Sequence, residues 1–166
     1  MPAPQGTRIP MTLAGVNRLK EELKKLKSVD RPQNVRDIEE ARAHGDLSEN
    51  AEYHAAKERQ GFIDGRMKLL EDTIARAEIV DVAKLGGDQV KFGATVVLQD
   101  VEAETKVRYR IVGELEADLK AGRISIASPI ARALIGREAG DEITVQAPGG
   151  GKDYEILEVL WIEDPA

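Results

Sequence analysis

The chain has 166 residues, of which 33% are charged and only 4% are aromatic, and its formal net charge is −6. Its length fits one large domain or two small ones, and 42% hydrophobic residues argue against wholesale disorder. The lack of cysteine excludes disulfides and thiolate metal sites, the short apolar runs exclude a transmembrane helix, and the negative charge argues against a general nucleic-acid coat.

Composition changes in the middle of the chain. Residues 1–82 hold 14 basic and 15 acidic residues, which leaves 10 basic and 15 acidic residues for the remainder. The first part has long stretches without glycine or proline, whereas the second is rich in Gly, Val, Ile and Thr. We therefore expect a helical domain over 1–82 and a β-rich domain over 83–166.

The first helix is predicted to begin at Thr12, a good N-cap residue. Pro32 predicts a break or kink near residues 28–32, because proline removes a backbone donor and its ring clashes with the preceding turn. Apolar residues recur at three- and four-residue steps on both sides of this point, as expected for one face of a helix. They are Leu13, Val16, Leu19, Leu23 and Leu26, followed by Val35, Ile38 and Ala41.

Residues 44–47 predict a reversal, since Gly45 allows a left-handed backbone and Asp46 can cap a second helix. That helix carries a heptad seam of Ile63, Met67, Leu70, Ile74 and Ala77. Two amphipathic helices joined by a short turn must pack antiparallel, so we expect a long helical hairpin.

The second half predicts an antiparallel sheet with one short helix, which makes the fold class α+β. Ser128 is the expected cap of the helix, with Pro129 at its first position. The glycine run 149–151 lacks the spacing of a phosphate-binding loop, so it is interpreted as a hairpin loop. The expected strands span 94–99, 106–112, 124–127, 143–146 and 154–161, and the helix spans 130–135.

Candidate chemistry is concentrated at the hairpin tip, residues 44–50. Asp46 and Glu49 are a carboxylate pair suited to Mg²⁺ when another molecule supplies further ligands. The same two residues match a capping box, which needs no function. Asn50, Tyr53 and Lys57 are spaced to share one helix face, which is either functional or an ordinary polar face.

Residues 41–57 closely resemble the hairpin tip of the bacterial transcript-cleavage factors GreA and GreB. The resemblance extends from about residue 9 to residue 162, and the near balance of charge over 1–82 favours the GreA branch. Further matching segments are 9–12, 29–32, 92–96, 128–136 and 148–150.

This resemblance implies an N-terminal antiparallel coiled coil and a C-terminal FKBP-like domain. It implies a transcription elongation factor that binds RNA polymerase and inserts its coiled coil into the secondary channel. There it stimulates the polymerase's own cleavage of the 3′ end of backtracked RNA, which rescues arrested complexes and aids fidelity. Such a factor is no enzyme itself, and it meets RNA and DNA only within the polymerase complex.

The resemblance also implies roles for individual residues. Asp46 and Glu49 would be donated to the polymerase active site, where they share a Mg²⁺ ion, and no cofactor would be stably bound. Tip support falls on Asn50, Tyr53 and Lys57, and polymerase docking on Ser128 and Pro129. A cytoplasmic monomer without membrane contact is expected.

Three other functions stay open at this point. A protein of the same shape could block the channel and inhibit transcription. An FKBP-like domain could belong to a prolyl isomerase or chaperone, although fold analogy alone supports this and few aromatic rings are present to line a proline pocket. The hairpin could also be a structural adaptor whose tip is only a cap.

Overall fold

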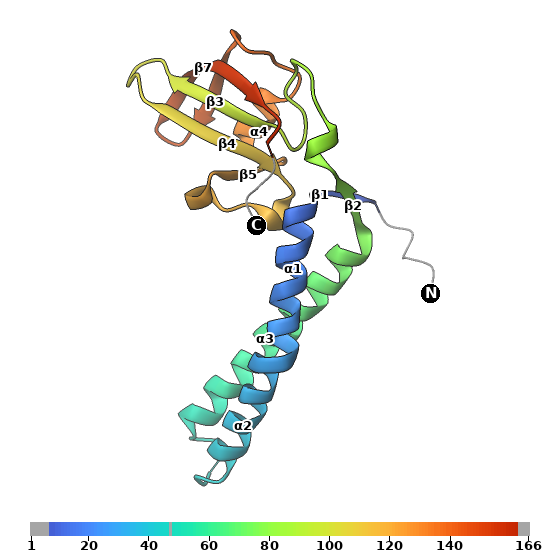
Figure 1. Cartoon of the computed structure of the whole chain (residues 1–166). Coiled ribbons are helices and arrows are strands. Elements are labelled where there is room, and N and C mark those ends of the chain that lie inside the picture. The colour runs from blue at the N-terminus through green and yellow to red at the C-terminus, as the bar shows by residue number, and fades with distance from the viewer. Residues whose placement is uncertain (1–6, 47, 163–166) are drawn as a thin grey trace. The chain divides into compact units, whose positions relative to one another are not determined.

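The computed structural model describes residues 7–46 and 48–162 (Figure 1). It divides into two compact units, which we call the hairpin unit (16–77) and the sheet unit (8–15 together with 78–162). The division thus falls slightly before the expected one after residue 82, and the first strand belongs with the second unit. The reason is that β1 (Ile9–Thr12) pairs with β2 (Ala77–Val80), far away in sequence.

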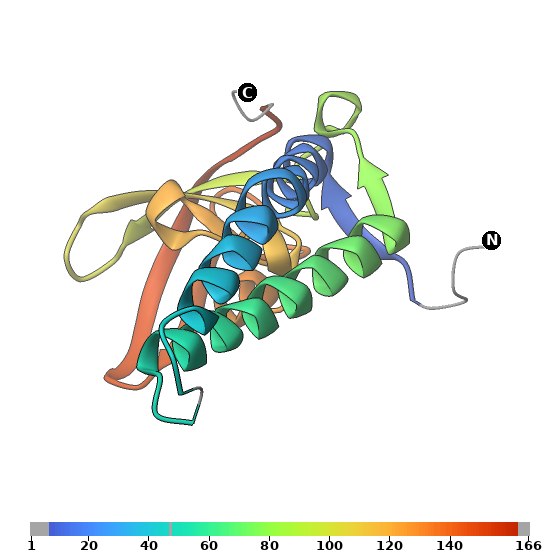
Figure 2. The same ribbon diagram turned by 90° about the horizontal axis from the view of Figure 1, so that it is seen from below.

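The hairpin unit is built from α1 (Leu13–Lys25), η1 (Leu26–Asp30), α2 (Arg31–Arg42) and α3 (Ala51–Arg76). The Thr12 hydroxyl accepts a hydrogen bond from the backbone N–H of Gly15 at 3.0 Å, which confirms the predicted start of the first helix. Figures 1 and 2 both show α2 and α3 side by side, joined by the tip turn. The predicted antiparallel helical hairpin is therefore confirmed.

The sequence predicts a break or kink near residues 28–32, and the structure has a local irregularity just before Pro32 in place of a break. Segment η1 is instead a single stretch of π-helix within an otherwise continuous rod, and the Arg31 backbone N–H bonds to the Leu26 carbonyl five residues earlier. A π turn widens the backbone by one residue, so the chain passes the proline without ending the helix. Pro32 then lies in the first turn of α2, where proline is tolerated.

The helices pack through a seam of buried residues. In α3 this seam contains residues that the sequence predicts, whereas in α2 it differs from the prediction. Val35 is 44% exposed, whereas the neighbouring Asn34 is only 2% exposed and occupies the buried face. The Asn34 side-chain amide donates to the Ala56 carbonyl of α3 at 2.9 Å, so this buried polar group is satisfied. Leu13 is exposed, and Ala77 belongs to β2 rather than to the helix. The buried apolar seam consists of Val16, Leu19, Ala41, Ala56, Ile63, Met67 and Leu70.

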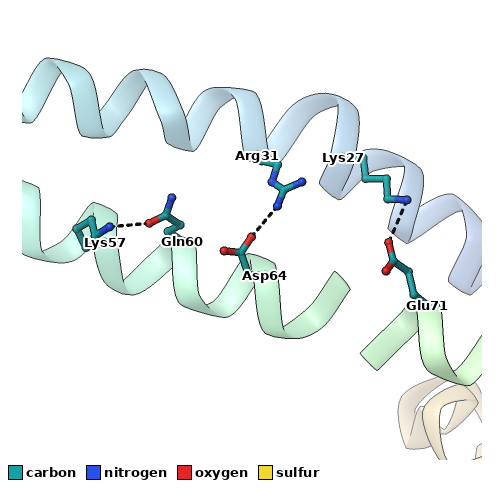
Figure 3. A network of polar contacts seen from close by, with 6 residues as sticks. All are labelled: Lys27, Arg31, Lys57, Gln60, Asp64 and Glu71. Carbon is teal, nitrogen blue, oxygen red and sulfur yellow. Dashed lines mark hydrogen bonds and ion pairs between the residues drawn. The ribbon is translucent and has the colours of Figure 1, made fainter. Parts of the chain in front are cut away.

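Ion pairs link the two sides of the hairpin along its surface (Figure 3). Lys27 pairs with Glu71 at 3.0 Å and Arg31 with Asp64 at 3.2 Å. These side chains are about half exposed, so each pair contributes roughly 0–1 kcal/mol. Together with Lys68 they line an open groove of about 510 Å³, in which four of the five charged side chains pair with one another. The groove therefore offers no unpaired cluster for a charged ligand.

The sheet unit contains a five-stranded sheet in the order β5-β4-β3-β7-β6, as predicted for an α+β domain. All neighbouring strands are antiparallel except β4 and β5, which run parallel. The predicted antiparallel sheet is confirmed in three of its four strand pairs. The parallel pair forms because the connection 113–122 carries two 3₁₀ turns and returns the chain in its original direction. The strands are β3 (Thr95–Asp100), β4 (Lys106–Val112), β5 (Arg123–Ser125), β6 (Glu142–Ala147) and β7 (Gly150–Leu160).

One short helix, α4 (Pro129–Leu134), packs into the core of this unit. The Ser128 hydroxyl accepts from the Ala131 backbone N–H at 3.3 Å, and Pro129 takes the first position, as predicted. A 3₁₀ turn, η2 (Val82–Lys84), follows β2. The core consists of Val90, Ala94, Val96, Leu98, Ile111, Ile124, Ala131, Leu134, Ile143 and Ile156.

A buried carboxylate ties β1 to the 3₁₀ turn Glu114–Glu116 within the sheet unit. Glu116 is 4% exposed and accepts hydrogen bonds from the Gly113 backbone N–H at 2.8 Å and the Thr12 backbone N–H at 3.2 Å. The Thr12 hydroxyl also donates to it. A Cβ on Gly15 would overlap this carboxylate, so the close approach requires glycine at that position.

Candidate functional site

The hairpin tip is an eight-residue connection between the end of α2 at Arg42 and the start of α3 at Ala51. Gly45 has a φ of +119°, a conformation that glycine adopts without strain. This confirms the predicted reversal. Leu47 lies outside the described residues.

Asn50, and not Asp46, is the N-cap of α3. The Asn50 side-chain oxygen accepts from the Tyr53 backbone N–H at 3.0 Å, and the helix begins one residue later. The predicted capping box of Asp46 and Glu49 is therefore wrong, because both residues precede the cap within the loop. Capping of α3, the alternative to metal binding at Asp46 and Glu49, is therefore carried out by Asn50.

Asn50 also closes the base of the tip. Its side-chain amide donates to the carbonyl of Ala41, near the end of α2, at 2.7 Å. One side chain thus joins the last turn of α2 to the first turn of α3, since its two polar ends serve opposite helices. This contact explains how a loop rich in polar residues keeps a defined geometry.

Asp46 is exposed and held in its ionised form. One of its carboxylate oxygens accepts from the Ser48 backbone N–H at 3.0 Å and from the Ser48 hydroxyl at 2.8 Å. These bonds, the backbone one first, lower the pKa of Asp46 below its ordinary value of 3.8. Glu49 is also exposed, and among the described residues its carboxylate has no hydrogen-bond or ionic partner.

The tip further contains a histidine that sequence analysis did not select. The Nε2 atom of His54 lies 3.3 Å from the Ser48 carbonyl oxygen. Its ring meets the Tyr53 ring edge-on, with centroids 5.7 Å apart. A histidine four residues into a helix can reach back to the preceding loop, and this spacing was the available signal.

Two of the proposed support residues lie further along α3. Tyr53 is half-buried, and the Lys57 ammonium donates to Gln60 at 2.9 Å (Figure 3). Within the described residues neither side chain forms a hydrogen bond or ion pair with Asp46 or Glu49. The structure therefore brings Asn50 to the tip loop as a structural clamp and leaves Tyr53 and Lys57 on the adjoining helix.

The donor set suits a hard cation only in part. No group of three or more histidine, aspartate or glutamate side chains that could hold a metal occurs in the part of the chain that the structure describes. Two exposed carboxylates provide oxygen ligands of the kind that Mg²⁺ prefers, but an octahedral site needs more. The tip residues thus fit a Mg²⁺ ion that a second molecule also coordinates.

The second predicted site lies in the sheet unit, at the start of α4. Pro129 is exposed, Ser128 is half-buried beneath its cap bond, and Ile135 just beyond the helix is 39% exposed. This is an accessible corner of the unit. Its geometry is compatible with docking and provides no acid, base or nucleophile for chemistry.

Comparison with known proteins identifies the family to which these features belong. Residues 9–79 match the model "Transcription elongation factor, N-terminal", and residues 85–160 match "Transcription elongation factor, GreA/GreB, C-term". Together the two matches cover the hairpin and the five-stranded sheet. The chain belongs to the GreA/GreB family of transcription elongation factors.

Individual members of the GreA/GreB family are similar over nearly the whole chain. A protein named transcription elongation factor GreA from Anaeromyxobacter sp. (strain K) is 62% identical over 157 residues, which covers 95% of both chains. The GreA of Rhodospirillum rubrum is 63% identical over 152 residues, covering 92% of this chain and 97% of the relative. In the described residues no helix is long and apolar enough to cross a membrane.

Solved structures of the same family also match. The crystal structure of GreA factor homolog 1 from Thermus thermophilus is 26% identical, with a TM-score of 0.42, and the match covers 92% of this chain and 99% of that one. The factor GreA/GreB from Nitrosomonas europaea is 25% identical, with a TM-score of 0.40 and coverage of 92% and 98%.

Proposed function

We propose that this GreA/GreB family member binds RNA polymerase and stimulates the polymerase's own cleavage of the 3′ end of backtracked RNA. The observation that carries the proposal is the state of the acidic pair at the tip. Asp46 and Glu49 are exposed, Asp46 is kept ionised, and neither is needed to cap α3. A carboxylate pair that is exposed and does not cap the helix is available to a second molecule.

The chemistry follows from what these two side chains can supply. The factor adds oxygen ligands to a polymerase active site and has no complete active site of its own. Bound there, a second Mg²⁺ stabilises charge on the reacting oxygens of a phosphodiester. Asp46 contributes an ionised carboxylate, and Glu49 is free to accept a hydrogen bond from the attacking water.

The two units divide the work in this proposal. The hairpin enters the secondary channel and carries the tip, while the sheet unit docks at the rim through Ser128 and Pro129. Asn50 holds the tip loop, and Tyr53 and Lys57 support it from α3. The factor acts as a cytoplasmic monomer, without a stably bound cofactor.

The test is release of the 3′ RNA fragment from a halted, backtracked polymerase complex with and without the protein. The proposal predicts faster release with the wild-type protein. Ser128→Arg should lower the apparent affinity for polymerase, because it places a bulky charge at the docking corner and removes the α4 cap. Unchanged release at saturating protein contradicts the proposal, and inhibition of RNA extension without cleavage supports the channel-blocking alternative.

A further inference from the structure

The tip loop is held by a short chain of polar contacts that ends on His54. Asp46 accepts two hydrogen bonds from Ser48, and the carbonyl of the same Ser48 lies 3.3 Å from the His54 Nε2 atom. His54 itself is fixed in the first turn of α3, where its backbone N–H bonds to the Asn50 carbonyl at 3.1 Å. Ser48 therefore interacts with Asp46 on one side and with His54 of α3 on the other.

We propose that His54 is a positioning residue for the acidic tip. Because a carbonyl oxygen can only accept, the His54 Nε2 atom carries the proton and donates to Ser48. This bond fixes Ser48, and Ser48 in turn orients the Asp46 carboxylate through its N–H and hydroxyl. The inference rests on the proposed function and adds to it the residue that sets the direction of the carboxylate.

No other hydrogen bond described at the tip connects Ser48 to α3. Asn50 clamps the base of the loop between Ala41 and Tyr53, and its side chain makes no hydrogen bond to Ser48 or Asp46 among the described residues. Without His54, the carbonyl side of Ser48 would be tied to the helix only through the backbone of residues 49 and 50. A carboxylate that binds a shared metal ion must be placed accurately, because a displacement of about 1 Å lowers the rate of the reaction.

The chain provides an internal control in its other histidine. His44 lies on the opposite side of the loop, is exposed, and has no side-chain partner among the described residues. Both histidines would share any general effect of an imidazole ring near the tip. Only His54 has the bond to Ser48, so a difference between the two positions reports on that bond.

Two substitutions at His54 separate its donor from its ring. His54→Gln keeps an amide N–H donor near the position of Nε2, whereas His54→Phe keeps the ring that contacts Tyr53 and removes the donor. The experiment measures 3′-fragment release at saturating protein, together with competition for polymerase binding. We expect His54→Phe to slow release by about 2- to 10-fold, the equivalent of one net hydrogen bond, without weaker binding. His54→Gln and His44→Phe should remain within about 2-fold of the wild type.

A nitrogen NMR spectrum of the imidazoles provides a readout independent of activity, and we expect the proton of neutral His54 on Nε2. Wild-type release by His54→Phe, or equal loss in His54→Phe and His54→Gln, would overturn the inference, as would a proton on Nδ1. A wild-type protein that does not stimulate cleavage contradicts the proposed function itself. The two failures are therefore distinguishable.

Discussion

At the scale of single residues, the state of Asp46 decides what the tip can do. Its carboxylate is fully exposed, yet two hydrogen bonds from Ser48 lower its pKa. Since the folded pKa lies below the ordinary value of 3.8, folding favours the ionised form. The stabilisation of the tip by the two hydrogen bonds to the Asp46 carboxylate is present above about pH 4 and is lost as the pH falls through the folded pKa.

Removing the Ser48 hydroxyl should raise the pKa of Asp46 without restoring it fully. Ser48→Ala deletes the side-chain donor but keeps the backbone N–H, which is the larger cause of the shift. A carbon NMR titration of the Asp46 carboxyl measures this value, with His44→Ala as the control that should leave it unchanged. An Asp46 pKa that is identical in Ser48→Ala and the wild type would contradict the assigned bonds.

The identity of the cap shows where sequence reasoning reached its limit. Aspartate and asparagine are comparable N-caps, so composition alone could not decide between Asp46 and Asn50. The choice depends on where helical hydrogen bonding begins, and that is set by the clamp from Asn50 to the Ala41 carbonyl across the hairpin. A contact between residues nine positions apart leaves no local periodic pattern.

At the scale of elements, η1 corrects the register of the seam. Buried or half-buried positions Leu19, Leu26, Asn34 and Ala41 are separated by seven, eight and seven residues. The extra residue of the eight-residue step is absorbed by the π turn, which moves the buried position from residue 33 to Asn34. An unbroken 3.6-residue period could not predict this shift.

We expect that the π turn does not depend on Pro32. Pro32→Ala restores a backbone donor, but the buried residues on either side keep their spacing. The helix must therefore still accommodate one extra residue between Leu26 and Asn34. We expect the bond from the Arg31 N–H to the Leu26 carbonyl to persist in this variant. A crystal structure of the variant tests this, and a regular α-helix through 26–34 with Asn34 still buried would show that proline is the cause.

Two helical glycines should respond in opposite ways to the same substitution. Gly65→Ala on α3 meets open space and should stabilise the hairpin unit by about 0.5–1 kcal/mol. Gly15→Ala gains the same helix propensity but displaces the buried Glu116 carboxylate, so it should destabilise the sheet unit by at least about 1 kcal/mol. Amide hydrogen exchange in each unit measures both effects. Equal stabilisation by both substitutions would refute the role assigned to Glu116.

The main elements were predictable where their determinants are local. Strands β3 and β4 and the helix α4 follow from hairpin and capping patterns within a few residues of the observed bounds. Strands β1 and β2 were missed because each has four residues and its partner lies about 65 positions away. The parallel pairing of β4 and β5 was missed for a similar reason, since it depends on the path of residues 113–122.

At the scale of the whole molecule, two separate units carry two separate candidate sites. The tip residues belong to the hairpin unit, and Ser128 and Pro129 belong to the sheet unit. This organisation lets a variant lose one activity and keep the other, which a single composite site would not allow. The family match over both units supports treating docking and tip chemistry as parts of one function.

The most direct test of the account is 3′-fragment release from a backtracked complex across a Mg²⁺ titration. Asp46→Asn and Glu49→Gln remove charge and little else, since neither residue caps α3. Both variants should fold and compete normally for polymerase, lose stimulation at low Mg²⁺, and recover part of it at high Mg²⁺ by mass action. The double variant should lose little more than either single one, because the pair acts on one ion. Wild-type rates from both single variants at low Mg²⁺ would contradict the account.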